Sequence, residues 1–204
     1  MKAEALLKQL HSTGFIHIPY NNQLSADSIS SLVGKVILKT VIQPNEKSQR
    51  LLAGSEYIAP HTDHIAANFI LWQCNSQAAI GGDSILIDGY RILNSAGKDT
   101  LDYLSAVQVN SHKIFYFDKP SYPLFSKDSQ VIYYAPFLCE RPAGSKYLQA
   151  LVWFENQLSV ADKIEIKLSE GDWLLIDNHR MLHGRNSFPA DSGRMLTRYW
   201  IAKL

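Results

Sequence analysis

Most of this chain is divided into short apolar segments separated by turns, and this pattern restricts its fold more than any other feature. The segments that we expect to form strands span residues 68–74, 84–88, 107–117, 131–134, 163–168, 173–177 and 194–201. Among them lies one helical stripe, Tyr147, Leu151, Phe154 and Leu158, which predicts a helix over residues 145–158. So many short strands with so few helices between them are typical of a sandwich or barrel, not of alternating βα units.

The N-terminal part of the chain has a different pattern. The apolar positions of residues 3–10 share one helical face, and Gly14 is expected to end that helix. A short strand at residues 15–18 and a second helix over residues 25–34 are expected to follow. Residues 43–58 are polar and turn-prone, so we expect a loop there.

Composition narrows the class of protein. The chain has 204 residues, of which 46% are apolar and 19% charged, so we expect one folded domain over residues 1–204. The net charge of +1 argues against nucleic acid or an anionic membrane as a partner. Two cysteines make no disulfide framework, and no signal peptide or long apolar run is present, so a cytoplasmic protein is expected. The oligomeric state cannot be read from the sequence.

His61-Thr62-Asp63 is the first motif with chemical content. On a strand, residues i and i+2 point to the same face, so an imidazole and a carboxylate would lie side by side. The best candidate for a third ligand is His183, which follows the apolar strand at 173–177. Two histidines and one carboxylate on one face of a metal suit non-haem Fe(II) and oxygen chemistry.

Two further features fit such a centre. Gly81-Gly82-Asp83-Ser84 places Ser84 23 positions after His61, and Arg194 stands 11 positions after His183. Arg198 shares the strand face of Arg194 by even spacing. An arginine beside a metal is costly to bury unless it is paired. A dianionic co-substrate would supply that partner through a bidentate carboxylate contact.

Taken in order, the motifs H-x-D, GGDS, DNHRMLHGR and RMLTRYW resemble those of the Fe(II)/2-oxoglutarate-dependent dioxygenases of the taurine dioxygenase (TauD/TfdA) and clavaminate synthase-like superfamily. The resemblance implies a mainly β fold with flanking helices (α+β), a double-stranded β-helix or jelly-roll barrel, here close to the minimal size. It also implies that His61, Asp63 and His183 hold iron. Arg194 and Ser84 would bind the distal carboxylate of 2-oxoglutarate, and Arg198 either the co-substrate or an anionic substrate.

The implied reaction couples O2-driven decarboxylation of 2-oxoglutarate to succinate with oxidation of a C–H bond in a small molecule, such as an amino acid or a natural-product intermediate. By the same resemblance, Asp63 favours hydroxylation, desaturation or a related oxidation over halogenation, because the halogenase branch has a small residue at this position. Two alternatives stay open: a peptide, protein or carrier-bound substrate, and a cupin-like module that binds a metal or ligand without redox chemistry. Residues 43–58 and 118–146 are the candidate lid and substrate wall.

Several neighbouring residues are expected to have lesser roles. His64 should point away from the face of His61, and His179 should pack without binding metal. Asn178 is expected to hold the adjacent loop through side-chain hydrogen bonds. Arg180 and Arg185 are expected either to face solvent or to surround the mouth of the site.

Overall fold

The structure is a computed structural model that describes residues 3–44 and 54–203. Thirteen strands and five helices in these two ranges make it mainly β, as the sequence predicts. The larger sheet has five antiparallel strands, in the order β1 (Phe15–Ile18), β11 (Trp173–Asp177), β4 (Phe69–Ser76), β13 (Met195–Ala202) and β2 (Lys35–Ile42). The second sheet has four, in the order β10 (Ile164–Ile166), β5 (Ser84–Asp88), β12 (Met181–Arg185) and β3 (Ile58–His61).

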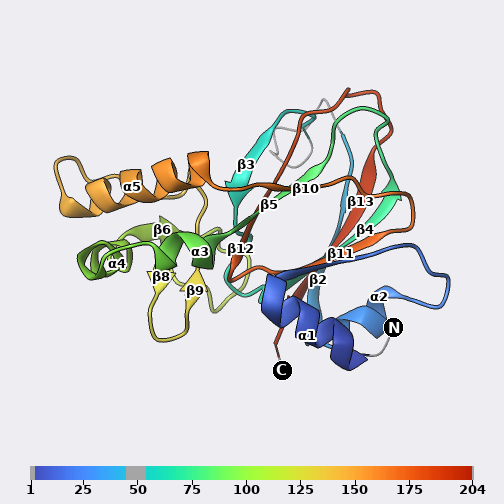
Figure 1. Cartoon of the computed structure of the whole chain (residues 1–204), viewed down its shortest axis with the longest axis horizontal. Coiled ribbons are helices and arrows are strands. Elements are labelled where there is room, and N and C mark those ends of the chain that lie inside the picture. The colour runs from blue at the N-terminus through green and yellow to red at the C-terminus, as the bar shows by residue number, and fades with distance from the viewer. Residues whose placement is uncertain (1–2, 45–53, 204) are drawn as a thin grey trace.

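The remaining elements flank these sheets (Figure 1). Helices α1 (Ala3–Thr13) and α2 (Ala26–Ser30) lie beside the five-stranded sheet. Three helices lie on the other side of the molecule: α3 (Gly89–Asn94), α4 (Lys98–Leu104) and α5 (Lys146–Val160). Two pairs of short strands lie with them. Strand β6 (Gln108–Asn110) pairs with β7 (Ser121–Pro123), and β8 (Phe125–Ser126) pairs with β9 (Val131–Ile132). No helix in the described parts of the chain is long and apolar enough to cross a membrane.

The inner strands of the five-stranded sheet, β11, β4 and β13, are largely buried on both faces, which explains why they are mainly apolar. Side chains alternate between the faces with the two-residue period of a strand. On β11, Leu175 packs in a cluster with Leu6 and Leu10 of α1, whereas Leu174 packs in a cluster with Leu86 of β5. The second cluster therefore fills the space between the two sheets.

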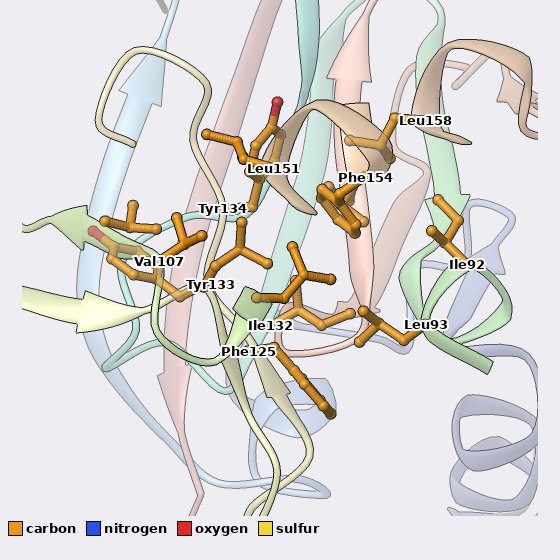
Figure 2. Packing of buried hydrophobic residues seen from close by; sticks show 14 of the residues in the cluster. Ile92, Leu93, Val107, Phe125, Ile132, Tyr133, Tyr134, Leu151, Phe154 and Leu158 are labelled. Carbon is orange, nitrogen blue, oxygen red and sulfur yellow. The ribbon is translucent and has the colours of Figure 1, made fainter. Parts of the chain in front are cut away.

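Helix α5 covers the other face of the four-stranded sheet. Of the apolar stripe read from the sequence, Leu151, Phe154 and Leu158 are buried (Figure 2), whereas Tyr147 is 43% exposed. The three buried residues pack with side chains of α3 and of the segment around β8 and β9 (Figure 2), and the cluster also includes Leu182 of β12. This packing supports the strand that carries His183.

Some predicted elements differ from the structure. The strand expected at 107–117 is limited to β6, because Asp118 accepts hydrogen bonds from the amides of Ile114 and Phe115 and turns the chain there. Strands β2 and β12 and helices α3 and α4 were not predicted. The second helix ends at Ser30, not near residue 34. Of the predicted 43–58 loop, residues 45–53 lie outside the described residues.

The packing of α5 predicts the effect of truncating its most buried ring. Phe154 is 0% exposed, so Phe154→Ala should lower the free energy of unfolding by about 3–5 kcal/mol through lost transfer energy and a residual cavity. Val152→Ala, at a position that is 42% exposed on the same helix, should change it by no more than about 0.5 kcal/mol. Urea unfolding measures both; equal losses would contradict the packing described here.

Candidate active site

His61, Asp63 and His183 lie together in a buried cluster, as predicted. One ligand atom from each lies within 4.8 Å of the others, and all three residues are buried. The imidazole Nε2 atoms of His61 and His183 lie 3.8 and 3.7 Å from the same oxygen, Oδ1 of Asp63. Antiparallel pairing of β3 with β12 sets the two histidines directly opposite one another. Three atoms that can bind a metal, two imidazole nitrogens and one carboxylate oxygen, thus face one point.

The backbone around Asp63 differs from the predicted strand. Strand β3 ends at His61, and the next residue is tied to Tyr134 by reciprocal hydrogen bonds, Thr62 N–H to the carbonyl at 2.7 Å and Tyr134 N–H to the Thr62 hydroxyl at 2.8 Å. The pleat of a strand therefore does not position Asp63. A hydrogen-bonded turn does so instead.

Asn178 holds this turn. Its side-chain oxygen accepts the backbone N–H of Asp63 at 2.8 Å, and its amide nitrogen donates to the carbonyl of Ala67 at 2.7 Å. The residue is 0% exposed, so water cannot replace these bonds. The predicted role of Asn178 in fixing the adjacent loop is confirmed.

The protonation states of the cluster suit a divalent metal. His61 Nδ1 lies 2.9 Å from the carbonyl of Ala59, which can only accept, so Nδ1 carries the proton and Nε2 is free to bind metal. Burial, together with the nearby His183, lowers the pKa of His61 to about 4. Burial alone would raise the pKa of Asp63, but Arg198 and the two histidines hold it well below its usual range. Neutral imidazoles and one carboxylate are the donors that non-haem iron requires.

A small, partly open cavity extends from the two histidines. Its wall contains the predicted co-substrate residues Ser84, Arg194 and Arg198. Its apolar lining comes from Ile42, Ile58, Trp72, Leu86 and Leu196. The structure thus brings every predicted site residue to one place, with the metal cluster at the cavity and cationic groups on its wall.

Arg194 is 3% exposed and its hydrogen bonds go to neutral groups. Its Nε donates to the side-chain oxygen of Gln77 at 3.0 Å and its Nη2 to the carbonyl of Gly82 at 3.1 Å. Burial lowers the pKa of Arg194 to about 10, which leaves it charged at neutral pH. No carboxylate in the described residues lies within salt-bridge distance of it. The charge is available for an anion in the cavity.

Of the two positions that the sequence left open for Arg185, solvent or the mouth of the site, the structure shows the second. Arg185 is 6% exposed, lines the same cavity and lies directly opposite Ser84 in the pairing of β12 with β5. Its Nη2 donates to the carbonyls of Gly54 and Glu56, both at 2.8 Å. Its guanidinium and that of Arg194 lie 4.5 and 5.2 Å from the ring of Phe188. The even spacing of Arg185 from His183 was the signal that could have identified it.

Arg198 contacts the metal cluster itself. Its Nη1 donates to Oδ2 of Asp63 at 2.7 Å, and Trp200 Nε1 donates to the same oxygen at 2.8 Å. Trp200 therefore also belongs to the site. The predicted contact of Arg198 with a co-substrate or substrate stays a prediction.

The other nearby residues lie outside the ligand set. His64 is buried and its Nε2 lies 3.2 Å from Oδ2 of Asp118. His179 packs with Nε2 2.8 Å from the carbonyl of Ile65, as expected. Arg180 forms an ion pair with Asp88 at 2.6 Å and does not line the cavity.

The low pKa of His61 predicts a pH dependence of stability in the metal-free protein. Between about pH 6.5 and about pH 4 the unfolded chain binds a proton at His61 that the folded chain excludes, so stability falls as the pH falls. From pH 7 to pH 5 the wild-type chain should lose about 2 kcal/mol more than His61→Gln. Urea unfolding at both pH values measures the difference; parallel losses would show that His61 is not buried in its neutral form.

Comparison with known proteins agrees with this geometry. A family model described as taurine catabolism dioxygenase TauD, TfdA family, matches residues 4–200. No curated protein matches the chain by sequence. The structure of an asparagine oxygenase in complex with Fe(II), 2S,3S-3-hydroxyasparagine and succinate has a TM-score of 0.74 and 17% identity, over 98% of this chain and 78% of that chain.

The non-heme iron oxygenase OrfP in complex with Fe and alpha-ketoglutaric acid has a TM-score of 0.73 and 16% identity, over 98% of this chain and 79% of that one. OrfP with Fe, succinate and (3S)-hydroxy-L-Arg has a TM-score of 0.74 and 17% identity, over 98% of this chain and 77% of that chain. At such identities the likeness shows a shared fold. Together with the family match over residues 4–200, it leads to one conclusion: the chain belongs to the TauD/TfdA dioxygenase family.

Proposed function

We propose that this chain is an Fe(II)- and 2-oxoglutarate-dependent oxygenase that oxidises, most simply by hydroxylation, a C–H bond of a small molecule such as an amino acid. One observation carries the proposal: a buried two-histidine, one-carboxylate cluster opens into a cavity with buried arginines. A metal-binding module without redox chemistry would need the two-histidine, one-carboxylate cluster but not the buried arginines. The cupin-like alternative therefore leaves the arginines unexplained.

The site residues have distinct tasks in this proposal. His61 Nε2, His183 Nε2 and Oδ1 of Asp63 hold the metal. Arg194 and the hydroxyl of Ser84 bind the distal carboxylate of 2-oxoglutarate, and Arg185 adds a second positive charge to the same wall. When bound, Fe(II) supplies the activation of O2 that is coupled to decarboxylation of the co-substrate.

The apolar wall keeps water away from the reacting groups. Trp72 packs with its ring centroid 5.0 Å from that of His183, and Leu86 and Leu196 line the cavity beside it. Excluding water strengthens the ionic contacts of the co-substrate and limits side reactions. The chain thus binds, orients and shields, whereas the metal and O2 supply the oxidising power.

The proposal extends to the architecture and the substrate. The five-stranded and four-stranded antiparallel sheets with their shared core support a double-stranded β-helix that forms one domain over residues 1–204. The related structures contain hydroxyasparagine and hydroxyarginine, which supports an amino acid or a similar small molecule here. A peptide or carrier-bound substrate is the alternative outcome of the test below.

Binding of the co-substrate can be tested without knowing the substrate. Under argon, the purified chain with Fe(II) and 2-oxoglutarate should develop a weak visible charge-transfer band. Arg194→Met should weaken 2-oxoglutarate binding about 10–100-fold, because a hydrogen-bonded charge contact is lost, and should leave metal binding unchanged. Absence of the band, with no succinate formed in air, would overturn the proposal. Equal loss of metal and co-substrate binding in the variant would indicate misfolding.

The substrate class needs a separate experiment. Free amino acids, short peptides and carrier-linked amino acids are each incubated with the enzyme, Fe(II), 2-oxoglutarate and air. A free amino acid should stimulate succinate formation and yield a product one oxygen atom heavier by mass spectrometry. Turnover of only the peptides or the carrier-linked compounds would contradict the small-molecule proposal while leaving the oxygenase assignment intact.

A further inference from the structure

The two oxygens of Asp63 have different environments. Oδ1 lies 3.8 Å from His61 Nε2 and 3.7 Å from His183 Nε2, so it points to the centre of the cluster. Oδ2 accepts two hydrogen bonds, one from Arg198 Nη1 at 2.7 Å and one from Trp200 Nε1 at 2.8 Å. Only one oxygen is therefore free to bind a metal.

Both residues that donate to Oδ2, Arg198 and Trp200, belong to strand β13. Arg198 and Trp200 are two positions apart and share one face of the strand. Pairing with β4 on one side and β2 on the other makes this an interior strand of the sheet. Both donors thus lie on a strand that is hydrogen-bonded on both sides, whereas Asp63 lies outside the sheets.

The indole of Trp200 is itself held in place. Its ring stacks on that of His64, with centroids 5.7 Å apart and an interplanar angle of 17°. His64 is in turn fixed by Asp118, with Nε2 3.2 Å from Oδ2 of that carboxylate. The Arg198 guanidinium lies 5.0 Å from the centroid of the Trp200 ring. Both donors are therefore constrained before any ligand binds.

Burial makes this arrangement energetically important. The side chains of Arg198 and Asp63 are each 7% exposed. A carboxylate at this depth is strongly destabilised without paired donors, and breaking such a pair by removing one partner is costly. The 2.7 Å contact of Arg198 with Asp63 gives this arginine a bound anion within the chain, unlike Arg185 and Arg194, for which no carboxylate among the described residues lies within salt-bridge distance.

We infer that Arg198, assisted by Trp200, is a positioning residue for the metal-binding carboxylate. The pair holds Oδ2 so that Asp63 offers the metal Oδ1 alone, which preserves the remaining positions for other ligands. Arg185 and Arg194, which have no such carboxylate partner among the described residues, are then the main groups for binding an anion. This inference rests on the proposed metal site.

Metal affinity tests the inference without any turnover. Co(II) is titrated into the metal-free chain, and binding is followed by its visible absorption. Arg198→Met should weaken Co(II) binding about 10–100-fold, as is typical for the loss of a group that orients a ligand. It should also change the absorption intensity, because Asp63 becomes free to bind through both oxygens. Arg198→Lys, which keeps a charged donor, should recover part of the affinity.

Trp200→Phe keeps the ring, removes one donor and gives an independent test if Arg198→Met does not fold. Like Arg198→Met, it should weaken Co(II) binding. The two changes in Co(II) affinity should not add up in the double variant, because both donors bind the same oxygen. Arg180→Met is the matched control, since it removes an arginine from an ion pair with Asp88 outside the cavity. It should leave Co(II) affinity unchanged.

Unchanged Co(II) affinity and absorption in Arg198→Met, together with weaker 2-oxoglutarate or substrate binding, would overturn the inference and make Arg198 an anion-binding residue. Failure of the wild-type chain to bind Co(II) would instead overturn the proposed metal site, and the inference with it. The inference would be supported if Arg198→Met weakens Co(II) binding while 2-oxoglutarate binding is lost only in Arg194→Met.

Discussion

The active site depends on one buried carboxylate, that of Asp63. Its backbone is fixed by Asn178, its Oδ2 by Arg198 and Trp200, and its Oδ1 faces His61 and His183. These contacts come from segments that are distant in the sequence, so the site forms only when both sheets have packed. The ionised form persists at this depth because Arg198 and Trp200 both donate to Oδ2 and the positive charge of Arg198 offsets the cost of burial.

The pocket has a strong charge imbalance that the net charge of the chain conceals. Arg185, Arg194 and Arg198 are all buried at one cavity, and Asp63 is the carboxylate that contacts one of them. The overall net charge is only +1. Like charges at low exposure repel, and burial together with the charge of Arg194 lowers the pKa of Arg185 to about 10. A dianion in the cavity would relieve this repulsion, which is the physical basis for assigning 2-oxoglutarate to it.

The grouping of the three candidate ligands could be predicted from the H-x-D motif and from its order along the chain with the later histidine. His61, Asp63 and His183 lie together as expected, and Asn178 holds the adjacent turn. Strand β12 was not predicted, and Arg185 was left between solvent and the mouth of the site, because a segment rich in histidine and arginine does not read as a buried strand. The role of Arg198 could not be predicted either. Even spacing placed it on the correct face, but only three-dimensional packing determines that Asp63 is its partner.

The central claim is that one divalent metal and one dicarboxylate occupy this cavity side by side. A crystal structure of the chain with Mn(II), as a redox-inert substitute for Fe(II), and 2-oxoglutarate tests it most directly. We expect the metal on His61, Asp63 Oδ1 and His183, and the distal carboxylate of 2-oxoglutarate on Arg194. Metal bound elsewhere, or a dicarboxylate that does not contact Arg194, would contradict the account.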